Sequence, residues 1–579
     1  MSNQDLVRIL DEIADLLDIQ GEEGFRANSY RRAARTLGDL TEEVARLAAE
    51  GGLDDLPGIG KSMREKIEQF LATGQVALHQ ELIKAVPPGL PAMLKIPGLG
   101  PKKAALLWRE LGVEGIDDLR KVIESGALAK VKGMGEKTAA QLKENLEFVS
   151  RASERTPLGL ALPLADELAA EVRKIPGVKQ VEIAGSLRRG AETIGDIDLV
   201  CSASNGEKVI EAFAALPAVE RVLAKGDTKG SVIARRRDGE EIRAQIRVVP
   251  PESIGAAWLY FTGSKEHNVR LRELAIKKHL KLNEWGLFKG EEPIAGRDEK
   301  GIYQKLGLPW IPPELREDRG ELTAGMKLPK LVERTDIRGD LHMHTSASDG
   351  TLTAPQMAEA ASRLGYEYIA ITDHSKSSAI ANGLSIDRMW RQIDKLRKLN
   401  ERHDTISVLV GCECDILPDG SLDYPDSVLA ACDIVVASVH SAMRQDRETV
   451  TKRVIAAIEN PFVTTIGHPT GRLIGRRQPM DLDMAAVIEA AARTHTALEL
   501  NASWQRLDLA DRYVHMAREA GVMIVIDTDA HAPVQLEQMD LGIRVARRAW
   551  LTADHVLNTR PISVVKRWIA RKRKPAAKT

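Results

Sequence analysis

Short apolar runs alternate with helical stretches throughout the second half of this 579-residue chain. Runs of this kind are typical of buried strands, and strands separated by helices predict parallel strand–helix–strand units. Seven such units indicate an α/β barrel. We place the seven strands at 339–344, 368–372, 406–411, 433–438, 463–467, 497–501 and 522–527.

Histidines and acidic residues stand at or just beyond the ends of these strands, and ten of the thirteen histidines follow residue 340. The carboxyl ends of parallel barrel strands converge on one face, where active sites form. Imidazoles and carboxylates gathered there would be unfavourable alone, but they are favourable as ligands to several divalent cations. The predicted ligands are His342, His344, Asp349, His374, Glu413, His440, His468, Asp529 and His531.

These motifs resemble the PHP (polymerase and histidinol phosphatase) family over the region 337–579. The resemblance implies a distorted seven-stranded β/α barrel that holds up to three metal ions, with manganese and zinc both open as the metal. Neighbouring metal ions can activate a water molecule and hold the oxygens of a phosphoester.

Other side chains near these motifs have smaller expected roles. Arg472 is a candidate to hold substrate phosphate, and Cys412 and Cys414 should pack beneath the site. Four histidines fit helices or loops and are expected to be ordinary surface or packing residues: His403, His495, His515 and His555.

The first 150 residues have helical periodicity and contain three similar glycine turns, spaced about 35 to 40 residues apart as in an internal repeat. A turn of this kind exposes backbone N–H groups at the start of a helix, which suits a phosphate, especially with a monovalent cation on the carbonyl side. The turns resemble helix-hairpin-helix motifs, which grip the DNA backbone without reading sequence. The candidate DNA-binding glycines are Gly58, Gly60, Gly98, Gly100, Gly133 and Gly135.

The segments LPGIGKSMREKIEQFLATG and IPGLGPKKAALLWRELGVEG are similar to the lyase and fingers regions of DNA polymerase beta. The resemblance implies a lyase-like helical domain over 1–80 and a fingers-like domain over 81–154. The lysine that forms a Schiff base in the family corresponds to Lys66. Tyr30 and Arg26 are candidates to line the pocket of Lys66. The charges of Lys61 and Arg64 could depress the pKa of Lys66, as an amine nucleophile requires. Ser62 stands where the family usually has lysine.

The segment EIAGSLRRGAETIGDIDLV resembles the nucleotidyltransferase palm, which we place over 155–250 in an α+β fold. Asp196 and Asp198 alternate along a strand, so their carboxylates point the same way and can share metal ions, magnesium or manganese. A thumb over 251–315 and a linker over 316–336 follow, which makes the chain multidomain. The candidate nucleotide-binding residues are Gly185, Ser186, Arg189, Gly195, Tyr260, Phe261, Gly263, Asn268 and Arg272.

One palm position departs from the family. Nucleotidyl transfer needs a third carboxylate on an adjacent strand, and the matching residue here is Gln245, a neutral and poor ligand for magnesium. Glu241 lies on the same strand face, but four residues along a strand is roughly 13 Å. The expectation is a palm that binds nucleotide better than it catalyses.

The composition is that of an ordinary globular protein, with 43% hydrophobic and 28% charged residues and a net charge of −1. Basic clusters near the amino end and in the tail RKRKPAAKT remain compatible with DNA, because phosphate binding is local. From the sequence we expect neither a secretory signal nor a membrane-spanning run, and the four cysteines form no CxxC pair. We expect a protein of the bacterial cytosol and nucleoid.

The resemblance as a whole implies a bacterial family X DNA polymerase with a PHP domain, acting in DNA repair on gapped or nicked DNA. The preferred expectation is 3′-to-5′ exonuclease activity by the PHP domain, with abasic-site incision or 3′-phosphate removal as further options, and weak or absent synthesis from dNTPs. Three alternatives stay open: a gap-filling polymerase of base excision repair, a small-molecule phosphatase of histidinol-phosphate type, and a DNA-binding scaffold without activity.

Overall fold

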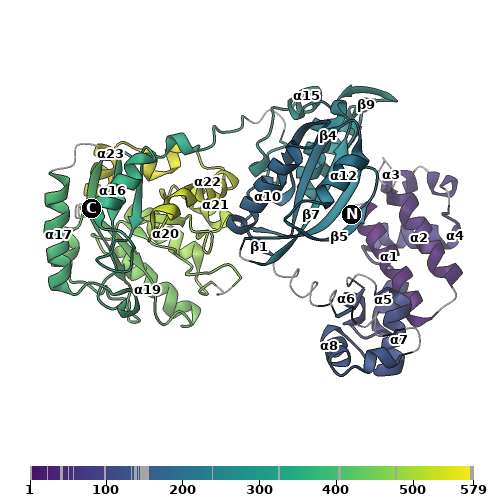
Figure 1. Ribbon diagram of the computed structural model, residues 1–579, viewed down its shortest axis with the longest axis horizontal. Coiled ribbons are helices and arrows are strands. Elements are labelled where there is room, and N and C mark those ends of the chain that lie inside the picture. The colour runs from purple at the N-terminus through teal and green to yellow at the C-terminus, as the bar shows by residue number, and fades with distance from the viewer. Residues whose placement is uncertain are drawn as a thin grey trace. The chain divides into compact units, whose positions relative to one another are not determined.

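The computed structural model describes residues 3–573 apart from several short segments and forms two compact units, Met1–Glu154 and Arg155–Thr579 (Figure 1). The residues outside the description within this span are 22–23, 39–43, 50, 57, 95, 97–98, 132–133, 136–139, 141, 144–145, 147–154, 238, 324–326, 402–405, 476 and 478.

The first unit is helical, as the sequence predicts. Its helices are α1 (Asn3–Gln20), α2 (Gly24–Gly38), α3 (Val44–Ala49), α4 (Lys61–Thr73), α5 (Ala77–Lys84), α6 (Leu90–Met93), α7 (Pro101–Leu111) and α8 (Ile116–Glu124). In α1 the apolar residues recur every three or four positions, and Leu6, Leu10, Ile13 and Leu17 are completely buried. This spacing places one face of α1 in the core of the unit.

A five-stranded sheet begins the second unit, with the strand order β2-β4-β7-β6-β5. The strands are β2 (Val178–Ile183), β4 (Asp196–Ala203), β5 (Val219–Lys225), β6 (Lys229–Arg235) and β7 (Glu241–Val249). The neighbours β4 and β7 run parallel. Helices α10 (Leu158–Arg173) and α12 (Gly206–Ala214) share a core with Leu199 and Cys201, while Val200 packs with α13 (Ile254–Thr262) on the other face.

A smaller α+β region follows this palm sheet. It contains α13, α14 (Lys265–Lys277), α15 (Glu299–Lys305) and the antiparallel strands β8 (Lys281–Asn283), β9 (Gly286–Lys289) and β10 (Glu292–Ala295). The expected linker over 316–336 is incorrect at its amino end, because Arg316 and Glu321 are buried there. Their charges are paired: Arg316 binds Glu299, and Glu321 binds His267 at 2.7 Å. A charged segment therefore belongs to the thumb core.

The remainder of the second unit is the expected barrel. Its seven parallel strands lie in chain order: β11 (Gly339–Met343), β12 (Tyr368–Ile371), β13 (Ser407–Asp415), β14 (Ile434–Ser438), β15 (Thr465–Ile466), β16 (Ala497–Asn501) and β17 (Ile524–Asp527). A bridge between Met343 and Ala530 brings the first strand beside the end of the last, so the barrel is nearly closed.

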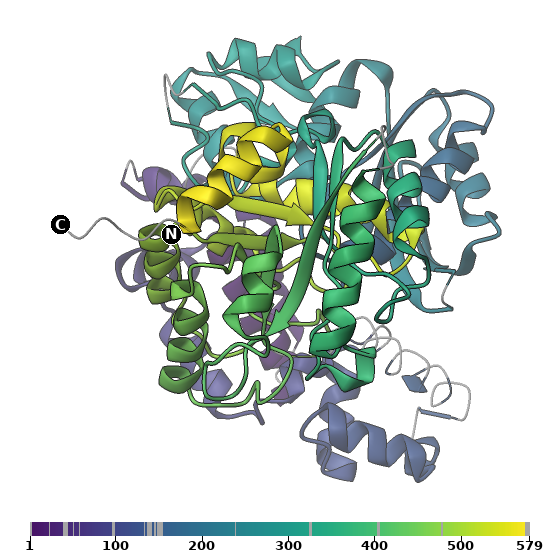
Figure 2. The ribbon, with the colours of Figure 1, turned by 90° about the vertical axis from the view of Figure 1, so that its left-hand side faces the viewer.

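Helices cover the barrel strands on the outside (Figure 2). They are α16 (Ala354–Arg363), α17 (Ile386–Asn400), α18 (Asp426–Ala431), α19 (Arg447–Glu459), α20 (Met484–Thr494), α21 (Asp511–Glu519), α22 (Met539–Arg548) and α23 (Ile562–Arg573). None of the described helices combines the length and the apolar character that crossing a membrane requires.

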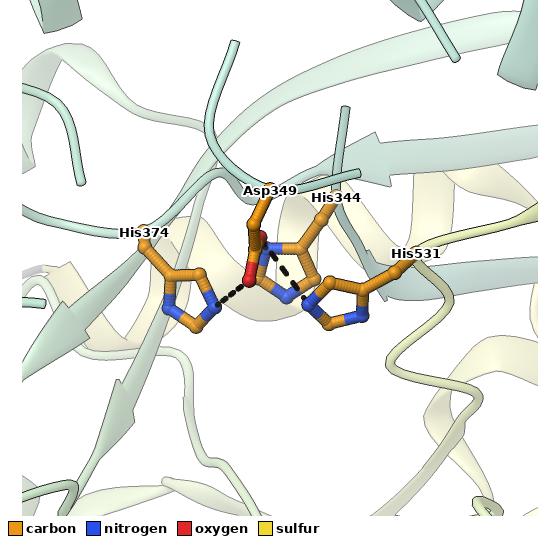
Figure 3. Close-up of side chains that lie close together, drawn as sticks. All are labelled: His344, Asp349, His374 and His531. Carbon is orange, nitrogen blue, oxygen red and sulfur yellow. Dashed lines mark ion pairs between the residues drawn. The ribbon is translucent and has the colours of Figure 1, made fainter. Parts of the chain in front are cut away.

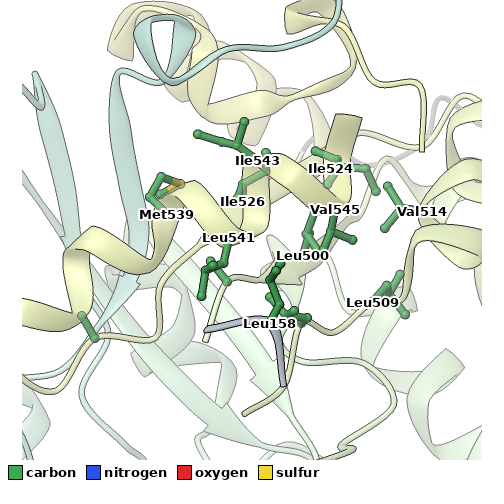
Figure 4. Close-up of a cluster of buried hydrophobic side chains, with 14 of the residues drawn as sticks. Leu158, Leu500, Leu509, Val514, Ile524, Ile526, Met539, Leu541, Ile543 and Val545 are labelled. Carbon is green, nitrogen blue, oxygen red and sulfur yellow. The ribbon is translucent and has the colours of Figure 1, made fainter. Parts of the chain in front are cut away.

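The palm and the barrel share one hydrophobic core within the second unit. Leu158 at the start of α10 is completely buried in the same cluster as Leu500 and Leu541 of the barrel (Figure 4). Gly159 lies so close that an added Cβ would be 2.4 Å from Cβ of Trp504 and 2.9 Å from Leu541. The first turn of the palm helix is therefore packed directly against the barrel.

This close approach gives a test. Gly159→Ala should lower the free energy of unfolding of the second unit by about 1–3 kcal/mol, and with it the melting temperature, because a new methyl group cannot fit without shifting the packed atoms. Differential scanning calorimetry of the full chain measures the effect. The control is Gly226→Ala, where the added Cβ meets only a carbonyl oxygen at 3.6 Å. Equal midpoints for the two variants would contradict the packing.

Candidate active sites

The nine predicted metal ligands come together at the carboxyl ends of the barrel strands. His342 lies in β11 and Glu413 in β13, and the other seven lie in the loops that directly follow β11, β12, β14, β15 and β17. Their ligand atoms form three groups, each within 4.8 Å: His344, Asp349, His374 and His531; His342, His344 and Asp529; and His374, Glu413 and His440.

The first group surrounds Asp349 (Figure 3). Its carboxylate lies 3.3 Å from Nε2 of His531 and 3.7 Å from Nε2 of His374. The ring of His344 stacks against those of His374 and His531, with centroids 4.3 and 4.1 Å apart. Rings gathered in this way direct their nitrogen atoms toward a common carboxylate.

Glu413 joins the remaining ligands. This completely buried carboxylate lies 2.8 Å from Nδ1 of His374, 3.4 Å from Nε2 of His440 and 3.1 Å from Nε2 of His468. His468 is absent from the three groups, but this distance places it at the same centre. All nine predicted ligands therefore belong to one cluster.

The cluster has the donor set that divalent ions require. His342 Nε2, His344 Nδ1 and Glu413 Oε2 are buried without a hydrogen-bond partner among the described residues. A buried polar atom without a partner costs free energy, which coordination to a metal ion would offset. Imidazole nitrogen and carboxylate oxygen suit manganese and zinc alike.

Carboxylates behind the ligands hold two of the imidazoles in position. Glu499 of β16 lies 2.6 Å from Nδ1 of His342, and Asp415 of β13 lies 2.5 Å from Nδ1 of His440. A carboxylate on one ring nitrogen leaves the other nitrogen to face the metal. Sequence reasoning missed both residues, although Glu499 and Asp415 stand in strands where the same search could have found them.

The charges of the cluster act against one another. Burial, with the neighbouring His374 and His531, lowers the pKa of His344 to about 3. Burial alone would raise the pKa of Glu413, but the surrounding imidazoles hold it well below its usual value. Against the effect of burial, the neighbouring carboxylates raise the pKa of His440 to about 10 and that of His531 to about 9, so these imidazoles must release protons before they bind cations.

The palm carboxylates lie on β4 as predicted. Asp198 pairs in register with Gln245 of the parallel strand β7, and Gln245 Nε2 donates a hydrogen bond to Asp196 Oδ2 at 2.5 Å. Burial and the charge of Asp196 raise the pKa of Asp198 to about 7. The amide thus occupies a lone pair of Asp196 that a carboxylate in its place would leave for a metal ion.

Of the predicted nucleotide-binding residues, Gly185 lies directly against these carboxylates. Gly185 has a φ of +64°, and an added Cβ would lie 2.3 Å from Oδ2 of Asp198, so only glycine fits. Arg189 donates to the carbonyl of Thr262 at 2.5 Å and to Glu317 at 2.9 Å. These bonds hold Arg189 near the turn at Gly263, whose added Cβ would lie 3.2 Å from the same guanidinium.

The other predicted nucleotide contacts lie in α11 (Gly185–Arg188), before β4 and in α13 and α14. Ser186 follows Gly185 in the short helix α11, and Gly195 directly precedes β4. The rings of Tyr260 and Phe261 are in edge contact, with centroids 5.1 Å apart. Asn268 donates to the carbonyl of Tyr260 at 2.7 Å, and Arg272 lines a small hollow with both.

Two glycine turns of the first unit end in the same hydrogen bond and the same kind of helix cap. Ile59 and Leu99 each donate a hydrogen bond to the residue three positions earlier, and Gly60 and Gly100 then cap α4 and α7 in extended conformation. An added Cβ at Gly60, Gly100 or Gly135 meets nothing within 4 Å. The backbone is therefore open to a partner at these turns. The turn at Gly58 needs a φ of +83°, whereas Gly98 and Gly133 lie outside the described residues.

The predicted lyase residue lies on α4. Nζ of Lys66 is 6.0 Å from the ring centroid of Tyr30 and donates a hydrogen bond to Oγ of Ser62 at 3.0 Å. Ser62, at the position where the family has lysine, thus holds the Lys66 amine. Tyr30 is buried, whereas Arg26 and Lys61 are exposed.

Comparison with known proteins finds four family models along the chain. A helix-hairpin-helix domain matches residues 1–76, a SAM-like helix-hairpin-helix tandem 90–147, a DNA polymerase beta thumb 257–317 and a PHP domain 340–503. The "DNA polymerase/3'-5' exonuclease PolX" of Bacillus subtilis (strain 168) is 38% identical over 99% of this chain and all of its own length.

The chain belongs to the PolX family. Two more distant relatives match parts of it. A probable phosphatase of Thermoanaerobacter sp. (strain X514) is 30% identical over 41% of this chain and 95% of its own length. DNA polymerase lambda of Rattus norvegicus is 26% identical over 54% of this chain and 56% of its own length.

One predicted contact of this PolX protein is wrong. Arg472 does not turn to the metal ligands, because its guanidinium donates to the carbonyls of Arg506 and Leu507 and pairs with Glu192 of the palm at 2.6 Å. Arg506 instead lies beside the cluster, with Nε 3.6 Å from Oδ2 of Asp529. The position of Arg472 four residues after His468 in the sequence does not indicate that its side chain turns away from the ligands.

The cysteines and the remaining histidines have the minor roles that were expected. Cys412 and Cys414 are buried in the hydrophobic core, and Sγ of Cys412 lies 3.9 Å from Sγ of Cys432. His515 and His555 lie outside the cluster with backbone or local contacts, and His495 ends α20. His403 lies outside the described residues.

Metal removal tests the cluster. EDTA should lower the thermal stability of the second unit and Mn²⁺ or Zn²⁺ should restore it, because the ions bind only the folded state. When the free metal ion is a thousandfold above its Kd, binding raises the free energy of unfolding by about 4 kcal/mol. Calorimetry of the full chain measures the shift, which His342→Ala should reduce. An identical melting temperature of the wild type with EDTA and with Mn²⁺ would refute the assignment.

Proposed function

We propose that this PolX protein is a DNA-repair enzyme that binds gapped or nicked DNA and degrades 3′ ends with its PHP domain. The observation that carries the proposal is the single cluster of nine ligands at the open face of the barrel. The name of the Bacillus subtilis relative, which includes both polymerase and 3'-5' exonuclease, supports it over the full length of the chain. Such a substrate implies work at the nucleoid of the bacterial cytosol.

The PHP domain would act as a phosphoesterase. When bound, two or three manganese or zinc ions would supply an activated water and hold the phosphate oxygens. The nine ligands named above would hold the ions, while Glu499 and Asp415 keep the rings of His342 and His440 oriented. Abasic-site incision and 3′-phosphate removal use the same chemistry and would be further activities of this centre.

The helical unit would grip DNA through its backbone. The open turns at Gly60 and Gly100 present N–H groups to phosphate, with a monovalent cation on the carbonyl side. Contacts of this kind are indifferent to base sequence. Lys66 beside Tyr30 is the proposed nucleophile of a lyase reaction on a 5′-deoxyribose phosphate.

The palm would bind dNTP better than it extends a primer. Asp196 and Asp198 can hold the divalent ion of the nucleotide, with Gly185, Ser186 and Arg189 at its phosphates. Gln245 supplies no charge for a second ion and donates to Asp196 instead. Activation of the primer 3′-hydroxyl would therefore be weak.

The alternatives have less support. A gap-filling polymerase would need another group to replace the missing carboxylate, and Glu241 is four residues from Gln245 along β7. A small-molecule phosphatase accounts for the barrel alone, since the probable phosphatase matches only 41% of the chain. An inactive scaffold leaves the complete ligand cluster unexplained.

The nuclease proposal is tested on the PHP ligands. His342→Ala and Asp529→Ala should each reduce the shortening of a labelled 3′ end by at least about a hundredfold, because each removes a ligand of the metal that activates water. DNA affinity should stay near that of the wild type. His515→Ala is the matched control, since this histidine lies outside the cluster. Undiminished degradation by the double variant would sink the assignment.

The palm proposal is tested at Gln245. All variants carry Asp529→Ala, which prevents degradation. In this background the palm with Gln245 should extend a gapped primer poorly. Gln245→Asp should raise extension at least about tenfold, because it restores an anionic ligand. Gln245→Asn, which shortens the side chain without adding charge, is the control. Robust gap filling by the protein with Gln245 intact would contradict the proposal.

A further inference from the structure

The guanidinium of Arg506 lies at the rim of the metal-ligand cluster and makes no side-chain hydrogen bond to the residues that the structure describes. Its Nε lies 3.6 Å from Oδ2 of Asp529, and its side chain is 17% exposed. Its Nη1 is buried and has no hydrogen-bond partner among the residues that the structure describes. A guanidinium N–H left without a partner in this way costs free energy unless a ligand accepts it.

The backbone around Arg506 is held in place. The N–H groups of Arg506 and Leu507 both donate to the carbonyl of Ser503, at 2.8 and 2.9 Å. Arg472 donates to the carbonyl of Arg506 at 2.9 Å and also to that of Leu507. The backbone that carries the Arg506 side chain is therefore fixed by the fold, even though it lies in an irregular segment after β16.

Pairing with Asp529 does not account for this arginine. Asp529 already has other partners among the described residues: Nε2 of His344 at 3.1 Å, Nε2 of His342 at 3.7 Å, Nδ1 of His531 at 3.8 Å and the amide of Asn501 at 3.2 Å. Arg506 approaches it with Nε at 3.6 Å, while the buried Nη1 group is left for another acceptor.

The chemistry of the missing acceptor follows from the donor. A guanidinium presents a planar fork of N–H groups that matches two oxygens of a phosphate. Beside ligands for divalent ions, such a fork would hold a phosphate oxygen that the ions leave unbound. We infer that Arg506 binds the phosphate of the substrate in the PHP centre. The inference rests on the proposed phosphoesterase function. It gives Arg506 the phosphate-binding role that the sequence analysis expected of Arg472.

Inorganic phosphate is a direct probe. With the full chain loaded with Mn²⁺, Arg506→Ala should weaken phosphate binding about tenfold to a hundredfold in isothermal titration calorimetry, as expected for loss of a charge-assisted hydrogen bond. Arg506→Lys, which keeps the charge without the fork, should retain part of the affinity. Bound manganese per chain should equal that of the wild type in both. The control Arg493→Ala removes an exposed arginine paired with Glu459 and should change nothing.

Two outcomes would overturn the inference. Phosphate affinity in Arg506→Ala equal to that of Arg493→Ala would remove the proposed contact. Loss of manganese from both Arg506→Ala and Arg506→Lys would show that Arg506 only supports the ligands. The nuclease function is tested separately on the wild-type protein. If the wild-type protein does not shorten 3′ ends, the nuclease proposal fails. If it does shorten them but Arg506→Ala leaves phosphate affinity unchanged, only the Arg506 inference fails.

Discussion

The buried carboxylate of Glu413 is the charge around which the carboxyl-terminal barrel is organised. Three imidazoles, those of His374, His440 and His468, approach it within 3.4 Å, and it is completely shielded from water. An isolated carboxylate could not be buried in this way, because its desolvation would cost too much. The parallel strands solve this problem by bringing imidazoles from separate strand ends to one point, and the fold and the chemistry of the barrel therefore have the same cause.

The barrel and its ligands could be predicted because each ligand lies in an apolar run or in the loop that follows one. That pattern fixes both the strand and the end of the strand from which the side chain projects. Glu499 satisfies the same condition on β16 but supports His342 from behind, a distinction that depends on depth in the barrel. Arg472 and Arg506 could not be assigned in this way, since both lie in irregular loops where sequence does not determine side-chain direction. Likewise, the charge of Arg316 predicts exposure, whereas its pairing with Glu299 permits burial.

In the palm, strand position could be predicted from the sequence, but side-chain contacts could not. The sequence places Gln245 on a strand adjacent to that of the palm carboxylates, and in the structure it lies opposite Asp198 in the parallel pair β4 and β7. The hydrogen bond from Gln245 to Asp196 could not be inferred from the sequence, because it depends on a side-chain rotamer. The replacement of a carboxylate by an amide therefore has two effects: it removes a ligand and it engages one of those that remain.

The packing of Leu158 and Gly159 against the barrel bears on how this chain can evolve. A palm that no longer copied DNA would still cover an apolar part of the barrel, and its Glu192 would still hold Arg472 behind the Arg506 segment. Selection on the nuclease alone would then preserve the palm as a scaffold. A deletion of the palm would be penalised even where its own chemistry is dispensable, whereas a single change such as that at Gln245, which leaves the shared core intact, could persist.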